Sequence, residues 1–151
     1  MESEFVKSLE TAMKEHKIGS NIQRIEGWEF ALSQYLAEVK SIPFGWGTND
    51  CCLFSANWVN QLIGIDYMAE FRDQYTNEEE ALKIIEEHTN LVVELDSLLE
   101  PSAIPFARRG DIVMYKGALG ICNGMHSYFM LEKGLFPIKT SRCSNAWKVG
   151  I

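Results

Sequence analysis

The sequence has no long hydrophobic run and no excess of basic residues. None of its apolar stretches reaches the ~18 residues that a membrane-spanning helix needs, so we expect no membrane span. Lys and Arg together number 14 against 21 Asp and Glu, and the formal net charge is −7. Because phosphate backbones and anionic lipids repel an acidic chain, we expect neither nucleic acid nor an anionic membrane as a general partner.

A secretory leader is also missing from the first residues. The segment from Met1 to Phe5 lacks the basic start and the apolar stretch of a signal peptide. We therefore expect a protein that is made in a cytoplasm.

Cysteine is scarce and poorly spaced for a disulfide framework or a metal site. The four cysteines stand at positions 51, 52, 122 and 143. Adjacent cysteines rarely bond to each other, and a reducing cytoplasm keeps thiols free. A zinc site needs two closely spaced pairs, or Cys with His at metal spacing. We expect free thiols, no bound metal and no cofactor.

The composition is that of a folded domain with a sizeable core. Of 151 residues, 46% are hydrophobic and 23% are charged, which are ordinary globular values and argue against disorder. We expect one domain over residues 1–151. Residues 1–20 would form an N-terminal helical extension, because apolar residues recur at helical spacing over 1–18.

Hydrophobic spacing predicts helices in the first two thirds of the chain. One is expected over 22–40, and a short one over 65–75. A third is expected to begin at Asn77, whose side chain can cap the helix and is followed by three glutamates in the first turn. Residues 91–95 change to a period near two and favour a strand. Pro101 and Pro105 then indicate a loop.

The last third of the sequence reads as an antiparallel meander. A turn at 109–111 leads into an apolar strand over 112–115, and a second strand follows over 118–122. Asn123-Gly124 is a strong hairpin signal. Further strands are expected over 127–131, 135–138 and 147–149. Helices followed by a meander indicate an α+β fold.

The stretch from Pro43 to Gly64 contains the clearest functional signal. A loop rich in glycine and aromatic residues leads into Thr48-Asn49-Asp50, whose side chains can accept hydrogen bonds from the first turn of a helix. Gly64 suits the helix end, since glycine adopts the left-handed conformation found there. We predict a buried helix between these signals, with Cys51 and Cys52 in its first turn.

A first-turn position favours a thiolate but does not by itself define a role. Unpaired N–H groups and the helix dipole place partial positive charge near Cys51, whereas Asp50 opposes this effect with negative charge. We therefore expect only modest activation of Cys51. Free cysteines are also among the most buried residues, so a structural pair and a reactive pair both remain open.

This stretch resembles the nucleophile segment of NlpC-type peptidases, which belong to the papain-like superfamily. The resemblance is carried by Trp46-Gly47, by Asp50-Cys51 and by the apolar helix that follows them. On that match Cys51 occupies the nucleophile position, while Cys52 and Leu53 replace the Ser and Gly of the family pattern. A closer likeness is to small phage-encoded proteins, often found among tail genes, that carry Pro-Phe-x-Trp-Gly-x-x-Asp-Cys and a late Ala-Trp.

The resemblance implies a papain-like NlpC-type fold and a histidine base that this sequence lacks. The nucleophile helix would pack on an antiparallel sheet. A Gly-Asp turn would lead into one strand of this sheet, and the base would begin the strand after it. In this sequence Ala118 holds the base position and cannot transfer a proton. His126 is a candidate substitute base, and it is also readily explained as an exposed turn residue. His16 and His88 have no spacing argument.

Two functions of different classes follow. The first, which we favour, is a phage tail-associated structural or assembly protein of tail-tip type. It would be located in the virion, bound to other tail proteins, with a catalytically degenerate NlpC-like domain. The alternative is an active cysteine peptidase or amidase that acts on peptidoglycan peptide or a tail protein, with Cys51 as nucleophile and His126 or a partner's residue as base.

Aromatic residues are the candidates for a binding groove, since Trp and Tyr dominate interface hot spots. The residues expected in a groove or interface are Phe44, Trp46, Asp50, Tyr115 and Trp147. For Phe44 and Trp46 a role in the core is an equally good interpretation.

Overall fold

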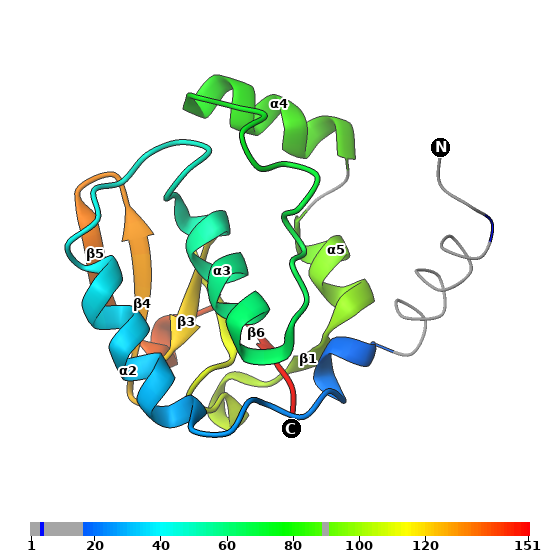
Figure 1. Cartoon of the computed structure of the whole chain (residues 1–151), viewed down its shortest axis with the longest axis vertical. Coiled ribbons are helices and arrows are strands. Elements are labelled where there is room, and N and C mark those ends of the chain that lie inside the picture. Colours follow the sequence, from blue (N-terminus) through cyan, green and yellow to red (C-terminus); the bar gives the residue numbers. More distant parts are fainter. Residues whose placement is uncertain (1–3, 5–16, 89–90) are drawn as a thin grey trace.

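A computed structural model describes residues 4, 17–88 and 91–151. The helix predicted over 1–18 falls largely outside these residues. Within the described part the fold is α+β, as predicted, with the helices gathered on one face of a six-stranded antiparallel sheet (Figure 1).

The helices of the described part, including three short 3₁₀ helices labelled η, precede and interrupt the sheet. In chain order the elements are η1 (Ile18–Ser20), α2 (Trp28–Val39), α3 (Cys51–Ile63), α4 (Glu78–His88), α5 (Leu91–Leu98), β1 (Glu100–Ser102), η2 (Ile104–Phe106), β2 (Ile112–Tyr115), β3 (Ala118–Cys122), β4 (His126–Leu131), β5 (Gly134–Lys139), η3 (Thr140–Arg142) and β6 (Asn145–Lys148). The strand order is β1-β6-β2-β3-β4-β5, and all neighbours are antiparallel.

The central helix α3 has the predicted boundaries. The Asp50 carboxylate caps it by accepting a hydrogen bond from Leu53 N at 2.9 Å, and Gly64 ends it with a φ of 78°. Most of its apolar residues are buried, and the helix packs against β3 and β4. The N-terminal end of α3 therefore lies beside the start of β3.

The helix predicted over 22–40 begins later than expected, at Trp28. Residues 22–27 instead form hydrogen bonds to distant parts of the chain: Arg24 N donates to Ile151 O at 2.9 Å, and Ile25 N donates to Leu62 O at 3.1 Å. Gly27, with a φ of 74°, then allows the turn into α2. The predicted apolar face is confirmed, since Leu32, Leu36 and Val39 are buried and Trp28 and Tyr35 pack against the same core.

Two predicted elements are wrong. Residues 65–75 form turns because the Asp66 carboxylate accepts hydrogen bonds from Met68 N and from the Arg72 guanidinium, which holds the backbone in a local loop. Residues 91–95 belong to helix α5 and not to a strand. Apolar residues 91, 92, 95, 98 and 99 all pack against the main core, and this spacing is one face of a helix.

The prediction of a loop at Pro101 also needs correction. Glu100–Ser102 form strand β1, which pairs with β6. β1 lies at the edge of the sheet, where a proline without a backbone N–H is tolerated.

The meander that follows is confirmed. β2 to β5 occupy the expected positions, and Asn123 N donates to His126 O at 2.9 Å across the predicted hairpin turn. Helix α4 begins as predicted, with Glu80 N donating to Asn77 Oδ1 at 2.8 Å. β6 covers Asn145–Lys148, slightly earlier than the predicted 147–149. Among the described helices, none has the length and apolar character required to cross a bilayer.

A buried ion pair joins the N-terminal segment to the turn before β2. Arg24 Nη2 lies 2.9 Å from Asp111 Oδ1, and both side chains are only 2% exposed. Arg24 also donates to the carbonyls of Val149 and Arg109, while Asp111 accepts from Val149 N and Arg108 N. Burial raises the pKa of Asp111 and lowers the pKa of Arg24 to about 10.

Candidate functional site

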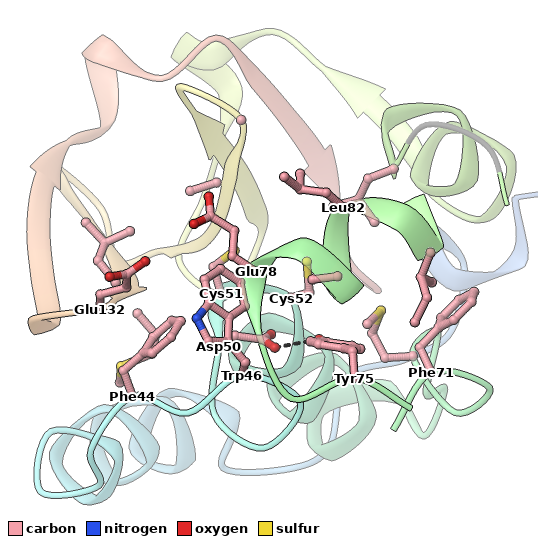
Figure 2. Close-up of a pocket in the computed structure, with 18 of the residues that line it drawn as sticks. Phe44, Trp46, Asp50, Cys51, Cys52, Phe71, Tyr75, Glu78, Leu82 and Glu132 are labelled. Carbon is pink, nitrogen blue, oxygen red and sulfur yellow. Dashed lines mark hydrogen bonds between the residues drawn. The ribbon is translucent and has the colours of Figure 1, made fainter. Parts of the chain in front are cut away.

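A cavity of about 470 Å³ opens at the N-terminal end of α3. Its walls come from the loop before α3, from the segment 68–75, from α4 and the start of α5, and from the turn between β2 and β3 with the end of β4. In Figure 2, Cys51 and Cys52 lie between Phe44 and Glu132 on one side and Tyr75 and Phe71 on the other. Volumes of 300–1,000 Å³ are typical of small-molecule sites.

Asp50 is the structural anchor of the cavity. Its Oδ1 caps α3, and its Oδ2 accepts hydrogen bonds from Gly47 N at 3.0 Å and from Tyr75 Oη at 2.5 Å (Figure 2). These bonds tie the loop before α3 and the segment after it to one buried carboxylate. Asp50 is therefore satisfied by fixed donors and serves to position the first turn of α3.

Gly47 permits a close approach between these two segments. Its φ is 79°, and a Cβ atom at this position would lie 2.0 Å from Tyr75 O. The short loop Trp46-Gly47 thus packs directly on the backbone of Tyr75. Any side chain at position 47 would displace the tyrosine that binds Asp50.

Cys51 is the more acidic of the two thiols. Hydrogen bonding with the Cys52 side chain lowers the pKa of Cys51 below its usual value, against the opposing effect of burial. Hydrogen bonding with the backbone of Leu119 lowers the pKa further, whereas the charge of the Asp50 carboxylate raises it.

Cys52 is correspondingly held as a thiol. Its hydrogen bond to Cys51 raises the pKa of Cys52 well above the usual value, and burial and the charges of Cys51 and Asp50 act in the same direction. Sequence reasoning named only the helix end as the source of activation. It missed the neighbouring thiol, because the sequence does not reveal how two adjacent side chains orient.

We expect Cys52→Ala to slow the alkylation of Cys51 by iodoacetamide at pH 7 by about threefold, since a thiolate loses one hydrogen bond of ordinary strength. The midpoint of the rate against pH should move upward in this variant. Mass spectrometry of the labelled peptide identifies the reacting cysteine. Cys52→Ser, which keeps a donor, should recover most of the rate, and Cys143→Ala, on the other face of the sheet, should change nothing. An unchanged rate in Cys52→Ala would contradict the assignment of Cys52 as donor.

Ala118 lines the cavity, yet its side chain lies on the far face of the sheet. Ala118 pairs with Tyr115, and both pack with Cys122 in the cluster opposite the helices. Its neighbours Leu119 and Ile121 point to the helical face. A histidine at position 118 would therefore start from the wrong side of β3 to reach Cys51.

His126 lies far from this end of the sheet. It begins β4, pairs with Lys139, and is exposed. The adjacent pair Ser127 and Cys122 marks the end of β3 that is opposite to Ala118. His126 does not line the cavity.

The described lining of the cavity contains no imidazole. Its ionisable groups besides the thiols and Asp50 are Tyr75, Lys116 and three glutamates, at positions 78, 94 and 132. His16 and the side chain of His88 lie outside the described residues. The described site thus combines an acidic thiol with mostly apolar walls and has no histidine to carry protons.

The other residues expected in a groove divide into two groups. Phe44 and Trp46 line the cavity and contact each other edge to face, with ring centroids 4.9 Å apart. Tyr115 lies on the opposite face of the sheet, beside the Arg142 guanidinium. Trp147 is 1% exposed and donates from Nε1 to Asp96 Oδ1 at 2.8 Å, so it belongs to the core.

Several cavity residues were not identified from the sequence. The apolar ones are Met68, Phe71, Ala81, Leu82, Ile84, Leu91, Met130 and Leu131. They come from four separate segments, and no motif connects them. Among the described residues, no group of three or more Cys, His, Asp or Glu side chains is arranged to hold a metal ion.

Comparison with known families gives one match. A family model with the description "Domain of unknown function (DUF6950)" matches residues 23–149. A search of curated proteins finds no match. The matched range includes the whole cavity, α3 and all six strands of the sheet.

Proposed function

We propose that this chain, which belongs to the family described as Domain of unknown function (DUF6950), is a phage tail-associated structural or assembly protein of tail-tip type. We further propose that its domain has a papain-like NlpC-type fold without peptidase activity. In this view the protein acts by binding other tail proteins in the virion.

One observation carries the loss of activity: Cys51 begins α3 beside a cavity whose described lining has no histidine. Amide cleavage needs a group that takes the thiol proton and returns it to the leaving amine. A thiol that is already ionised no longer needs a group to take its proton, but the leaving amine still needs a group that donates one. Loss of such a base costs about 10²–10⁴-fold in rate.

The fold proposal is supported by the order of the elements. A helix with a cysteine in its first turn precedes an antiparallel sheet, and the Gly110-Asp111 turn leads into β2, followed by β3. This order agrees with the NlpC-type pattern that the sequence resembles. The proposed location in a phage tail is supported by the similarity of residues 43–51 to small phage-encoded proteins.

We expect the purified protein not to cleave peptidoglycan stem peptides, because the described lining of the cavity has no imidazole to protonate the leaving amine. The assay incubates wild type and Cys51→Ala with purified stem peptides and detects new amines by mass spectrometry. The two proteins should give the same background. Hydrolysis by wild type that Cys51→Ala abolishes would overturn the proposal in favour of the peptidase alternative, and His88→Ala and His126→Ala would then identify the base.

The binding role is tested in particles of a phage that carries this gene. The protein should be detected by mass spectrometry in purified tails, and a phage with Cys51→Ala should form tails in normal number. If the protein is absent from purified tails, and deletion of its gene leaves tail number unchanged, the assignment to the tail is wrong.

A further inference from the structure

The chemistry open to Cys51 depends on the leaving group. An amide needs a proton on its leaving nitrogen, whereas a thioester expels a thiolate, which leaves readily without one. A thiol that is the more acidic member of a pair, in a cavity whose described lining has no imidazole, is therefore suited to thioester exchange. It is poorly suited to peptide cleavage.

The cavity next to Cys51 suits an aliphatic chain. Phe44, Trp46, Met68 and Phe71 form one part of its wall, and Leu82, Ile84 and Met130 form another part. Two polar residues of the lining, Asp50 and Tyr75, are bonded to each other, and Asp50 also accepts hydrogen bonds from the backbone N–H groups of Gly47 and Leu53. Figure 2 shows Leu82 of α4 on the side of the cavity toward which Cys52 points.

We propose that Cys51 is an acylation site, which accepts a medium- or long-chain fatty acyl group from a thioester and holds the chain in this cavity. The Cys51 thiolate attacks the carbonyl carbon of the donor, and a carbon–sulfur bond to Cys51 forms. The bond to the donor sulfur breaks, and the donor leaves as a thiolate that takes a proton from water. No oxidant or metal takes part.

Backbone groups at the site are placed to assist this exchange. The N–H groups of the first turn of α3, including that of Cys51, have no partner four residues earlier in the helix. The N–H of Leu53 is bonded to Asp50, which leaves those of Cys51 and Cys52 to stabilise the negative charge that a carbonyl oxygen gains during attack. The thiol of Cys52 stabilises the attacking sulfur before the bond forms.

The same site would preserve the acylated product. Hydrolysis of a thioester requires a base that activates water, and the described lining has no histidine for this task. An acyl chain in the cavity also excludes water from the sulfur. The feature that prevents peptidase activity thus makes an acylated Cys51 long-lived.

Charge at the cavity favours an uncharged donor. Three of the lining residues are glutamates, and Lys116 is the lining residue with a positive charge. An anionic carrier would meet more negative than positive charge there. We therefore choose the neutral thioesters of N-acetylcysteamine as probes.

We expect octanoyl-N-acetylcysteamine to acylate Cys51 at least tenfold faster than acetyl-N-acetylcysteamine, because each buried methylene adds about three- to fourfold to binding. Intact-mass spectrometry of the whole chain measures the rate, and peptide mapping identifies the cysteine. Equal rates for the two probes, or acylation that favours Cys122 or Cys143, would overturn the proposal.

Two variants test the role of the cavity with a matched control. Leu82→Glu places a charge beside the acyl chain. It should lower the ratio of the octanoyl rate to the acetyl rate at least tenfold. Val93→Glu makes the same change at an equally exposed helical position outside the cavity, and should leave the preference unchanged. Cys51→Ser should not be acylated at position 51. If both glutamate variants behave alike, the cavity does not hold the chain.

This inference rests on one part of the proposed function, the lack of an imidazole in the described lining, and does not depend on the tail location. Rapid release of octanoate with regeneration of free Cys51 would reveal a hydrolase, and would contradict both proposals. Acylation without preference for chain length would contradict the acyl site alone.

Discussion

Asp111→Ala should lower the free energy of unfolding by about 3–5 kcal/mol, the range found when one partner of a buried ion pair is removed. The substitution leaves the Arg24 guanidinium charged and 2% exposed without its carboxylate. It also leaves Val149 N and Arg108 N without their acceptor. Urea denaturation at pH 7, followed by tryptophan fluorescence, measures the effect.

The Asp66–Arg72 pair provides a control with the same chemistry at the surface. Its atoms are 2.7 Å apart, but its side chains are 23% and 31% exposed. Exposed pairs contribute about 0–1 kcal/mol, so Asp66→Ala should have a small effect. Similar losses in Asp66→Ala and Asp111→Ala would show that burial does not set the importance of the Arg24 pair.

Gly47→Ala should lower the free energy of unfolding by about 3–4 kcal/mol. A residue with a side chain pays about 1–2 kcal/mol for left-handed backbone geometry, and Gly47 has a φ of 79°. The new Cβ would also lie 2.0 Å from Tyr75 O, so Tyr75 must move and lose its bond to the Asp50 carboxylate. A hydrogen bond to a charged group contributes about 1.5–3 kcal/mol.

Gly64→Ala separates the two causes. Gly64 has nearly the same φ, 78°, but no atom lies within 4 Å of the Cβ position. This variant should lose only the backbone part, about 1–2 kcal/mol. The reactivity of Cys51 toward iodoacetamide should change in Gly47→Ala and not in Gly64→Ala, because only the first disturbs Asp50. Equal stability losses would contradict the importance of the Gly47–Tyr75 approach.

Local signals in the sequence predicted the elements whose boundaries depend on local chemistry. Asp50 and Gly64 delimit α3, Asn77 caps α4, and Asn123-Gly124 forms the expected hairpin turn. Where the structure of a segment depends on hydrogen bonds to distant residues, the prediction from sequence was wrong. Residues 22–25 have an adequate helical pattern, but the N–H groups of Arg24 and Ile25 donate to the carbonyls of Ile151 and Leu62.

The candidate site was only partly predictable for the same reason. The motif located Cys51 beside the cavity, together with Phe44 and Trp46. No motif in the sequence pointed to Tyr75 as a residue of the site. Its hydrogen bond to Asp50 joins residues that are 25 positions apart in the chain. The sequence also could not show that Ala118 faces away from the helices, which follows from the register of β2 and β3.

The sheet order has a consequence for folding during synthesis. β6, made last, lies between β1 and β2, and Ser20 and Arg24 bind Lys148 and Val149 across 128 and 125 positions. Contacts over such separations form late, because they close long loops. A nascent chain that still lacks β6 therefore leaves one edge of β2 open, and an open apolar edge pairs readily with other strands. On the ribosome this domain depends on the synthesis of β6 to protect the edge of its own core.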